Sequence, residues 1–418
     1  MSQYYDDFEN EDIKERQRRI ILRISEMVKL GWEKSGRIRK ICADKKLNHT
    51  ALKSLSDFNE FPVISREQLI ELESEEPPYG GLNNEDWEID RIFISPGPVY
   101  EPHLSEEDPL WARAYFAAGI GKKDIVLNAF SYHMVAAGLT FHGGLRRVGA
   151  TVVPSGTSSS QIQVQLIRDL GITAYTGTPS FLMSIIKKAK EMGYDFKRDF
   201  ILKRACFAAE PLDTSLREIF EKTYGIDTYQ MYGATEVGDI AFECSEKKGW
   251  HICEEVLVEI VDPHTGKSVP PGMYGEVVVT RINSIFFLFR FGTGDLSRMS
   301  EEICPCGRTS YRLDGIVGRV GDAVKVRGLF ITPKQVRTVQ EKYGGLKLRA
   351  VISRVAHEDI LTLEAEPTAA QGNHADLEMK VKSDFKDICT VKIDRFVFVK
   401  TGTINNSESV IVDNRKWT

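Results

Sequence analysis

The sequence lacks any long hydrophobic run. The longest apolar candidate, Ser284 to Phe289 (SIFFLF), is only as long as a strand and is followed by Arg290, whereas a helix that crosses a bilayer needs about 20 apolar residues. The first residues, MSQYYDDFENEDIKERQRR, are polar and acidic and differ from a secretory signal peptide. These absences argue against a membrane protein and against a secreted one.

The sequence also lacks a strong excess of charge and a regular cysteine framework. The net charge is −5 over 418 residues, which argues against a surface dedicated to nucleic acid or membranes. The seven cysteines are odd in number and unevenly spaced, as is typical of a reducing compartment. We therefore expect a cytoplasmic protein in which a close pair of cysteines is a metal candidate before it is a disulfide candidate.

The composition offers ample material for a folded core. Hydrophobic residues make up 42% and charged residues 28% of the chain, and this length suggests two or three domains. From Asp124 onward, short apolar runs alternate with helical stretches, which predicts βαβ units on a mostly parallel sheet. A helix is expected from Leu212 to Tyr224, with a capping box of Ser215 and Glu218. After Trp250, strands and turns dominate and predict a β-rich part.

A small α+β domain is expected at the C-terminus. The pattern there reads β-α-β-β-α-β, the split βαβ arrangement, with AVKVRG as its first strand and VKIDRFVFV as its last. The glycines of GRVGD suit a hinge between two lobes. The predicted organisation is therefore a large domain over 1–317, a hinge over 318–322 and a small domain over 323–418.

Five short motifs carry chemistry, and several of them hold groups that suit a nucleotide. In YGATE, an aromatic face can stack on a base, Thr235 can hydrogen-bond a phosphate oxygen and Glu236 can hold Mg²⁺. Asp295 and Arg319 can bond ribose hydroxyls or a phosphate. Each motif alone also fits an ordinary strand or turn. The five are AAEPLD (208–213), YGATE (232–236), FGTGD (291–295), CPCGRT (304–309) and GRVGDAVKVRG (318–328).

In this order the motifs resemble those of the adenylate-forming enzymes, most closely the phenylacetate–coenzyme A ligase branch. The resemblance covers nearly the whole chain, from FPVISREQL (61–69) to VDNR (412–415). It implies an α/β fold with a large domain of βαβ units, a β-rich subdomain and a small α+β lid. It also implies an enzyme that activates a carboxylic acid with ATP and Mg²⁺ as an acyl-adenylate. The acyl group then passes to coenzyme A or another thiol.

The resemblance also assigns residues to the nucleotide. Tyr232 would lie against adenine, Thr235 near the α-phosphate and Glu236 at Mg²⁺, the last two as catalytic residues. Asp295 and Arg319 would bind the ribose. The other nucleotide-binding residues that it implies are Ser95, Gly97, Ala209, Glu210, Pro211, Gly233 and Lys325.

For the acid, which is expected to be aromatic, the resemblance points to the segments NAFSYH and TPSF. The predicted pocket residues are Phe130, Tyr132, His133 and Pro179. Aromatic residues beside a buried loop are also ordinary core, so this interpretation has an alternative. A homodimer is implied by the resemblance alone.

Two departures from the family pattern concern the phosphates. Where the family carries SSGTTGKP, this chain has SPGPVYEP, which keeps Ser95 and Gly97, places Glu101 where the lysine stood and removes N–H donors with its prolines. The family's C-terminal lysine is also missing from NNSESVIVDNR (405–415). Loss of such a charge-stabilising group typically costs about 100- to 1000-fold in rate.

Three interpretations follow from these departures. The chain is a working acid–thiol ligase with unusual phosphate contacts, which we favour. It is alternatively an enzyme that handles a preformed acyl-adenylate or only its transfer to a thiol. The third interpretation is a homologue that binds AMP or acyl-adenylate without catalysis.

A cysteine cluster is a separate feature. Cys304 and Cys306 form a tight knuckle with the following glycine, and Cys244 with His251 supplies the other half of a Cys₃His zinc site. The phenylacetate branch carries similar residues. Free buried cysteines are the alternative. A closed four-ligand site of this kind would be structural.

Overall fold

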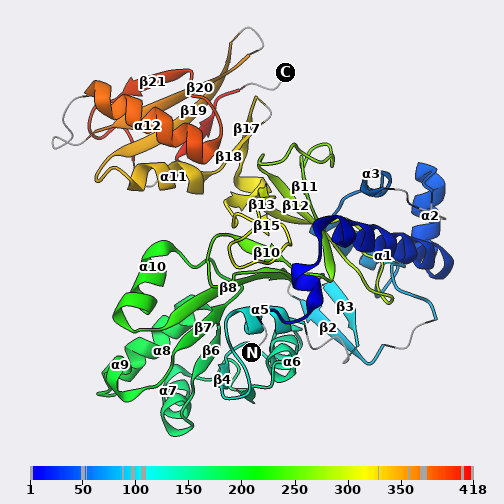
Figure 1. Ribbon diagram of the computed structural model, residues 1–418. Coiled ribbons are helices and arrows are strands. Elements are labelled where there is room, and N and C mark those ends of the chain that lie inside the picture. The colour runs from blue at the N-terminus through cyan, green and yellow to red at the C-terminus, as the bar shows by residue number, and fades with distance from the viewer. Residues whose placement is uncertain are drawn as a thin grey trace. The chain divides into compact units, whose positions relative to one another are not determined.

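The computed structural model describes most of the chain (Figure 1). The described residues are 3–48, 52, 54–86, 89–95, 99–104, 110–327, 329–355, 358–367, 374–405 and 409–415. By its contacts the chain divides into two units. The first comprises Met1–Glu259, Val278–Thr293 and Ser300–Asp314, and the second comprises Ile260–Val277, Gly294–Met299 and Gly315–Thr418.

A nine-stranded sheet forms the centre of the first unit. Its order is β14-β15-β10-β9-β8-β7-β6-β4-β5, and β5, β4, β6, β7 and β8 pair in parallel, as the alternation of strands and helices predicted. The strands are β4 (Ile125–Asn128), β5 (Thr151–Val153), β6 (Ala174–Gly177), β7 (Arg204–Phe207), β8 (Asp227–Ala234), β9 (Gly238–Phe242), β10 (Trp250–Ile252), β14 (Met299–Ser300) and β15 (Arg312–Leu313).

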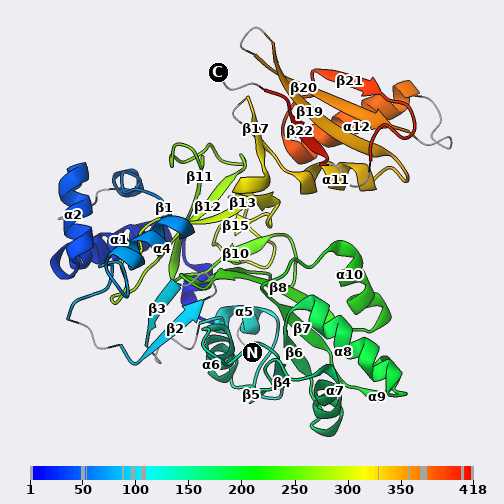
Figure 2. The ribbon, with the colours of Figure 1, turned by 180° about the vertical axis from the view of Figure 1, so that it is seen from behind.

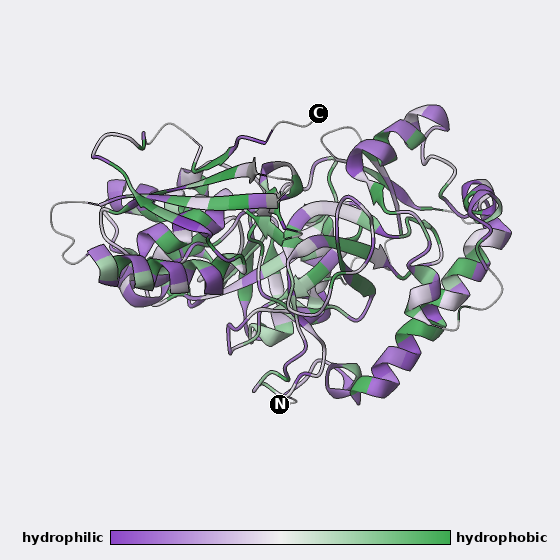
Figure 3. Cartoon of the chain, turned by 90° about the horizontal axis from the view of Figure 1, so that it is seen from above, coloured by the Kyte–Doolittle hydropathy of each residue, from purple (hydrophilic) through white to green (hydrophobic). Residues whose placement is uncertain are grey.

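Helices cover both faces of the parallel strands. Figures 1 and 2 show α7, α8 and α9 on one side and α5 and α6 on the other. In α8, Leu182, Ile185 and Ala189 recur at helical spacing and are fully buried against the strands. Figure 3 shows hydrophilic and hydrophobic residues mixed along the helices, as burial of one face requires. The helices are α5 (Ala112–Ala117), α6 (Ala137–Arg147), α7 (Ser160–Asp169), α8 (Pro179–Glu191) and α9 (Phe196–Asp199).

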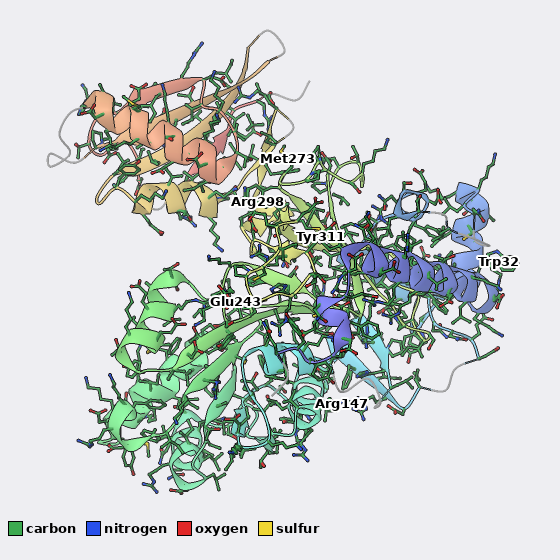
Figure 4. All side chains as sticks on the ribbon, in the orientation of Figure 1. Trp32, Arg147, Glu243, Met273, Arg298 and Tyr311 are labelled. Atoms are coloured by element: carbon green, nitrogen blue, oxygen red, sulfur yellow. The ribbon has the colours of Figure 1, made fainter. Side chains whose placement is uncertain are left out.

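The helix predicted from Leu212 to Tyr224 is shorter than expected. It begins as α10 (Thr214–Glu218) and continues as one π-helical segment, Ile219–Thr223. The predicted capping box was wrong, because Asp213 is the N-cap and its carboxylate accepts the Leu216 N–H at 2.8 Å. In Figure 4, Glu243 lies close to the sheet, and its carboxylate forms a bidentate pair with Arg217 of α10 at 2.8 Å.

The N-terminal segment is largely helical. In α1, Ile24, Met27 and Val28 form the buried face. No helix within the described residues is long and apolar enough to span a bilayer. The elements are a 3₁₀ turn (Asp7–Asn10), α1 (Ile13–Lys34), α2 (Gly36–Lys45), α3 (Leu55–Phe58), β1 (Ile64–Ser65), α4 (Arg66–Glu75), β2 (Arg91–Ser95) and β3 (Val99–His103).

Strands dominate after Trp250, as predicted. Three of them have residues in both units. They are β11 (Val256–Val261), β12 (Gly275–Arg281) and β13 (Phe291–Ser297). Within the first unit, β1 pairs in parallel with the start of β13. Within the second unit, the end of β13 pairs with β16 (Gly318–Arg319), so that Asp295 faces Arg319.

The C-terminal part of the second unit has the predicted α+β class. A four-stranded sheet in the order β21-β20-β19-β22 carries α11 and α12 on one face (Figures 1 and 2), with Val336, Val339, Val381 and Phe385 fully buried between them. The elements are β17 (Val324–Val326), β18 (Leu329–Ile331), α11 (Pro333–Glu341), β19 (Lys347–Val355), β20 (Glu358–Glu366), α12 (His374–Cys389), β21 (Arg395–Phe398) and β22 (Ile411–Asp413).

The strand membership of this sheet differs from the expectation in one respect. The stretch AVKVRG does not join the four-stranded sheet, because β17 pairs with β18 in a separate antiparallel ladder. The fourth place is taken by β22, which pairs in parallel with β19. The division at 1–317, 318–322 and 323–418 stays a prediction.

A buried ion pair connects distant segments of the first unit. Arg290 is 1% exposed and pairs with Glu259 through two contacts of 3.0 Å. The same guanidinium donates to the carbonyl oxygens of Asn59 and Phe61 at 2.6 Å. Arg290 therefore ties the chain ahead of β1 to β11. Burial raises the pKa of Glu259, whereas the charge and hydrogen bonds of Arg290 lower it. The ionised carboxylate therefore depends on Arg290.

We expect Arg290→Met to lower the free energy of unfolding by about 3–5 kcal/mol, because it leaves the Glu259 carboxylate buried without its cation. Replacing both residues by Met should restore much of the loss. Urea denaturation followed by circular dichroism measures this. The control is Arg18→Met in the exposed pair of Arg18 and Glu15, which should not move the transition. An Arg290→Met protein as stable as that control contradicts the assignment.

Candidate functional site

A cavity of about 180 Å³ lies in the first unit. Aromatic rings form much of its wall. Trp111 stacks on Phe141 with 4.6 Å between ring centroids, and Phe130 stacks on Phe141 with 4.3 Å between centroids. Polar groups gather elsewhere on the lining. The lining residues are Phe93, Glu101, Pro102, His103, Leu110, Trp111, Phe130, Ala136, Ala137, Thr140, Phe141, Ala208, Ala209, Gly233, Ala234, Thr235, Glu236, Gly238, Arg281, Asn283, Ile285 and Phe286.

The position of Trp111 depends on a glycine of the YGATE motif. A Cβ atom on Gly233 would lie 2.5 Å from the Trp111 ring and 2.4 Å from the Gly238 carbonyl oxygen. The backbone N–H of Trp111 donates to the Asp239 carboxylate at 3.2 Å, which fixes the main chain of the residue. Gly233 therefore shapes the aromatic wall as well as the loop that carries Thr235 and Glu236.

A network of hydrogen bonds forms the polar end of the cavity. Arg66, the first residue of α4, makes an ion pair with Glu236, and it donates to the Ser95 hydroxyl at 3.2 Å. The Thr235 hydroxyl donates to the other Glu236 oxygen at 3.2 Å. The Ser95 and Thr235 hydroxyls also hydrogen-bond the carboxyl group of Glu101, so the network closes on itself.

Buried carboxyl groups crowd this polar end. Burial, reinforced by the charge of Glu236, raises the pKa of Glu101 to about 7. Burial likewise raises the pKa of Glu73 in α4 to about 7, against a hydrogen bond from the Tyr100 N–H at 3.0 Å. His103 lies two residues beyond Glu101, and burial, with Arg281 nearby, lowers its pKa to about 4. The polar end is short of positive charge.

The other residues predicted to hold the nucleotide in the first unit lie at the ends of neighbouring strands. Tyr232 in β8 stacks on Trp250 at 5.4 Å and donates to the Thr293 hydroxyl at 3.3 Å. Ala209 follows β7 with a left-handed φ of 67° and lines the cavity. Glu210 accepts the Ser180 N–H and hydroxyl, at 3.2 and 2.8 Å. The next residue, Pro211, is exposed.

The predicted ribose residues form a pair within the second unit. Asp295 and Arg319 face each other across β13 and β16, with 3.1 Å between carboxylate and guanidinium. Gly97 and the side chain of Lys325 lie outside the described residues. The described end of the SPGPVYEP stretch shows a hairpin, because Ser95 on β2 pairs with Val99 on β3. Residues 406–408, in the stretch without the family lysine, also lie outside the described part.

Of the residues predicted for the acid, the structure places only Phe130 in the cavity lining. The Tyr132 hydroxyl instead bonds Asn128 at 2.8 Å and His142 at 3.0 Å, and burial raises its pKa to about 12. His133 is exposed. Pro179 is buried at the start of α8. These three are oriented by local hydrogen bonding or helix packing, and a direct role for them stays a prediction.

Several residues of this site were missed from the sequence, and three of them matter most. Trp111 and Phe141 supply the stacked wall, and Arg66 supplies the cation at the polar end. The only available signal for Arg66 was its place after Ser65, which forms a capping box with Gln68 at the start of α4. Such a signal predicts a helix start but not which side chain faces a cavity.

The predicted cysteine cluster comes together in the first unit. The ligand atoms of Cys244, His251, Cys304 and Cys306 all lie within 4.8 Å of one another, and all four residues are buried. The Ser310 hydroxyl lies 3.1 Å from His251 Nδ1 and so orients the ring with Nε2 toward Cys306, at 3.4 Å. Hydrogen bonding from Cys244 and the nearby imidazole lower the pKa of Cys306. A soft, closed donor set of this kind fits zinc.

Comparison with known proteins places this geometry in a family. A family model described as AMP-binding enzyme matches residues 108–285. The phenylacetate–coenzyme A ligase of Aromatoleum evansii is 30% identical over 84% of this chain and 82% of its own length. The Escherichia coli phenylacetate–coenzyme A ligase is 30% identical over 75% of this chain and 74% of its own.

A solved structure has the same fold. An open conformation of 2-hydroxyisobutyryl-CoA ligase, in complex with 2-HIB-AMP and CoA, aligns with a TM-score of 0.85 at 24% identity, over 99% of this chain and 95% of that one. None of these comparisons favours a homologue without catalysis. Their identity and coverage, together with the motif order and the cavity, show that the chain belongs to the phenylacetate–coenzyme A ligase family of AMP-binding enzymes.

Proposed function

We propose that this protein is an acid–thiol ligase that activates a small aromatic carboxylic acid as its acyl-adenylate and transfers the acyl group to coenzyme A. One observation carries the proposal: the stacked aromatic wall and the YGATE residues Thr235 and Glu236 line the same cavity. An acid bound against the rings would have its carboxylate at the polar end, where Thr235 and Glu236 of the YGATE motif would contact the α-phosphate of ATP.

The size of the cavity supports an acid with one ring. An apolar cavity of about 150 Å³ admits one benzene molecule, and this one measures about 180 Å³. The rings of Trp111 and Phe130, which line the cavity, suit offset stacking with a planar ring. A long acyl chain would exceed this space.

The first half-reaction joins the acid to AMP. A carboxylate oxygen attacks the α-phosphorus of ATP, a new P–O bond forms, and the bond to pyrophosphate breaks. Thr235 and Arg66 carry donors at the polar end, and they would bind oxygens of the α-phosphate as charge shifts onto the leaving group. Glu236, with an oxygen donor set, fits Mg²⁺, which would neutralise phosphate charge when bound.

The second half-reaction moves the acyl group to sulfur. The thiolate of coenzyme A attacks the acyl carbon, and AMP leaves with the electron pair of the broken C–O bond. The ion pair of Asp295 and Arg319 offers a carboxylate and donors that suit ribose hydroxyls. We place the hinge for the change between the two reactions at 318–322, where a Cβ atom on Gly321 would meet no atom within 4 Å. A homodimer and a cytoplasmic location stay predictions from the sequence.

The test of this function is thioester formation from ATP, Mg²⁺, coenzyme A and a panel of acids. Single-ring acids such as benzoate and phenylacetate should give AMP and thioester, detected by mass spectrometry, while long-chain fatty acids should give none. Ala137→Leu, which adds bulk to the cavity wall, should lower kcat/KM at least about 10-fold for ring acids and little for acetate. Absence of thioester with every acid, from a protein that melts cooperatively, contradicts the proposal.

The cysteine cluster supports a second proposal, a structural zinc ion held by Cys244, His251, Cys304 and Cys306. The N-terminal segment packs on the knuckle: Gln3 donates to the Cys306 carbonyl at 3.0 Å, and Glu9 pairs with Arg308 at 3.0 Å. Metal binding would therefore stabilise the contact between distant parts of the first unit.

We expect about one equivalent of zinc per chain in elemental analysis of the purified protein. Cys306→Ala should lose the metal and lower the melting temperature, because three ligands hold zinc less tightly than four. Cys253→Ala is the matched control: Cys253 is also buried, two residues from His251, but lies outside the cluster. Protein without zinc, or equal zinc in both variants, contradicts the site.

A further inference from the structure

Glu101 is a buried carboxyl group with an unused oxygen. It is 6% exposed and lines the cavity beside Thr235 and Glu236. Among the residues that the structure describes, none hydrogen-bonds Glu101 Oε1. An unsatisfied buried oxygen of this kind destabilises the fold, and more so when it is charged. The position is therefore costly unless a ligand completes it.

The charged groups around Glu101 say which kind of ligand fits. Facing it are Glu236 from the loop after β8 and Arg66 from α4, and Glu73 of α4 lies next to that pair. Arg66 is already engaged with Glu236. Three carboxyl groups thus share one guanidinium, and the phosphates of a nucleotide would add further negative charge. Such a site needs a cation together with the anion that it holds.

We propose that Glu101 is a second carboxylate ligand, beside Glu236, for the divalent cation that accompanies the nucleotide. The inference rests on the proposed function, since it concerns the same cavity. Mg²⁺ is usually held by one or two carboxylates together with phosphate oxygens. A pair of carboxylates is what the cavity lining offers, and Glu101 Oε1 is open to a metal without breaking a hydrogen bond.

Glu236 must exchange its partners before it can bind the cation. Arg66 and Thr235 hold its two oxygens. Both partners are donors, and a phosphate accepts hydrogen bonds from the same groups. Phosphate binding therefore releases Glu236 toward the metal, so cation and nucleotide should bind cooperatively.

Glu73 provides a matched control. It is also buried, at 4% exposed, and its Oε1 also has no hydrogen-bond partner in the described part of the chain. Its other oxygen accepts the Tyr100 N–H at 3.0 Å, and it does not belong to the cavity lining. Substitution at Glu73 thus changes the same local charge without removing a group that faces the nucleotide.

The experiment is a titration of the full-length protein with Mn²⁺, followed by electron paramagnetic resonance, with and without ATP and with no acid present. The wild-type protein should bind Mn²⁺ more tightly with ATP. Glu101→Gln should weaken Mn²⁺ binding in the presence of ATP by at least about 10-fold. Glu101→Asp, which keeps a carboxylate, should bind more tightly than Glu101→Gln. Glu73→Gln should behave as the wild type does.

Equal Mn²⁺ affinity in the wild-type and Glu101→Gln proteins overturns the inference, and so does equal weakening by Glu101→Gln and Glu73→Gln. Melting curves identify a variant that fails to fold. If Glu101→Gln does, Glu101→Asp is compared with the wild type and with Glu73→Asp: weaker Mn²⁺ binding by Glu101→Asp alone supports the inference, and equal binding by all three overturns it. These outcomes are separate from the proposed function. An active ligase whose Mn²⁺ binding ignores Glu101 keeps the function and rejects this inference, whereas a wild-type protein that makes no thioester with any acid rejects the function.

Discussion

The balance of charge around Arg66 is the constraint on which the site depends. One guanidinium, 34% exposed in its side chain, faces the buried carboxyl groups of Glu236, Glu101 and Glu73. Without added positive charge, carboxyl groups in such a place hold protons, which is why burial raises the pKa of two of them to about 7. A nucleotide and a cation would together restore the balance, with the phosphate binding Arg66 and the metal binding Glu236 and Glu101. We infer that this arrangement of charges suits a metal–phosphate pair.

The aromatic wall and this polar end are joined by one backbone feature. Gly233 allows Trp111 to approach the loop after β8, since any Cβ atom there would lie 2.5 Å from the ring. The same loop carries Thr235 and Glu236. A substitution at Gly233 would therefore disturb the aromatic wall and the Thr235–Glu236 loop together. The close approach of Trp111 explains physically why glycine follows the tyrosine in the YGATE motif.

Much of the fold could be predicted from the sequence, but the site only in part. The parallel strands β4 to β8 follow from alternation, and the ligand atoms of Cys244 and His251 meet the CPC knuckle as the motif indicated. Arg66 could not be found, because 170 residues separate it from Glu236 and no local pattern links them. The three-residue strand β22 was missed because it is too short to show a period. From the sequence, Glu101 only marked the loss of a lysine. That its Oε1 is buried without a hydrogen bond from the described residues depends on the tertiary structure.

The central claim is that this cavity adenylates an acid although Glu101 stands where the sequence resemblance implies a phosphate-binding lysine. Exchange of labelled pyrophosphate into ATP tests that step alone, since it requires the acid and Mg²⁺ but no thiol. The account predicts exchange that depends on a single-ring acid and disappears when that acid or Mg²⁺ is omitted. Tight binding of AMP, with no exchange for any acid, would contradict it.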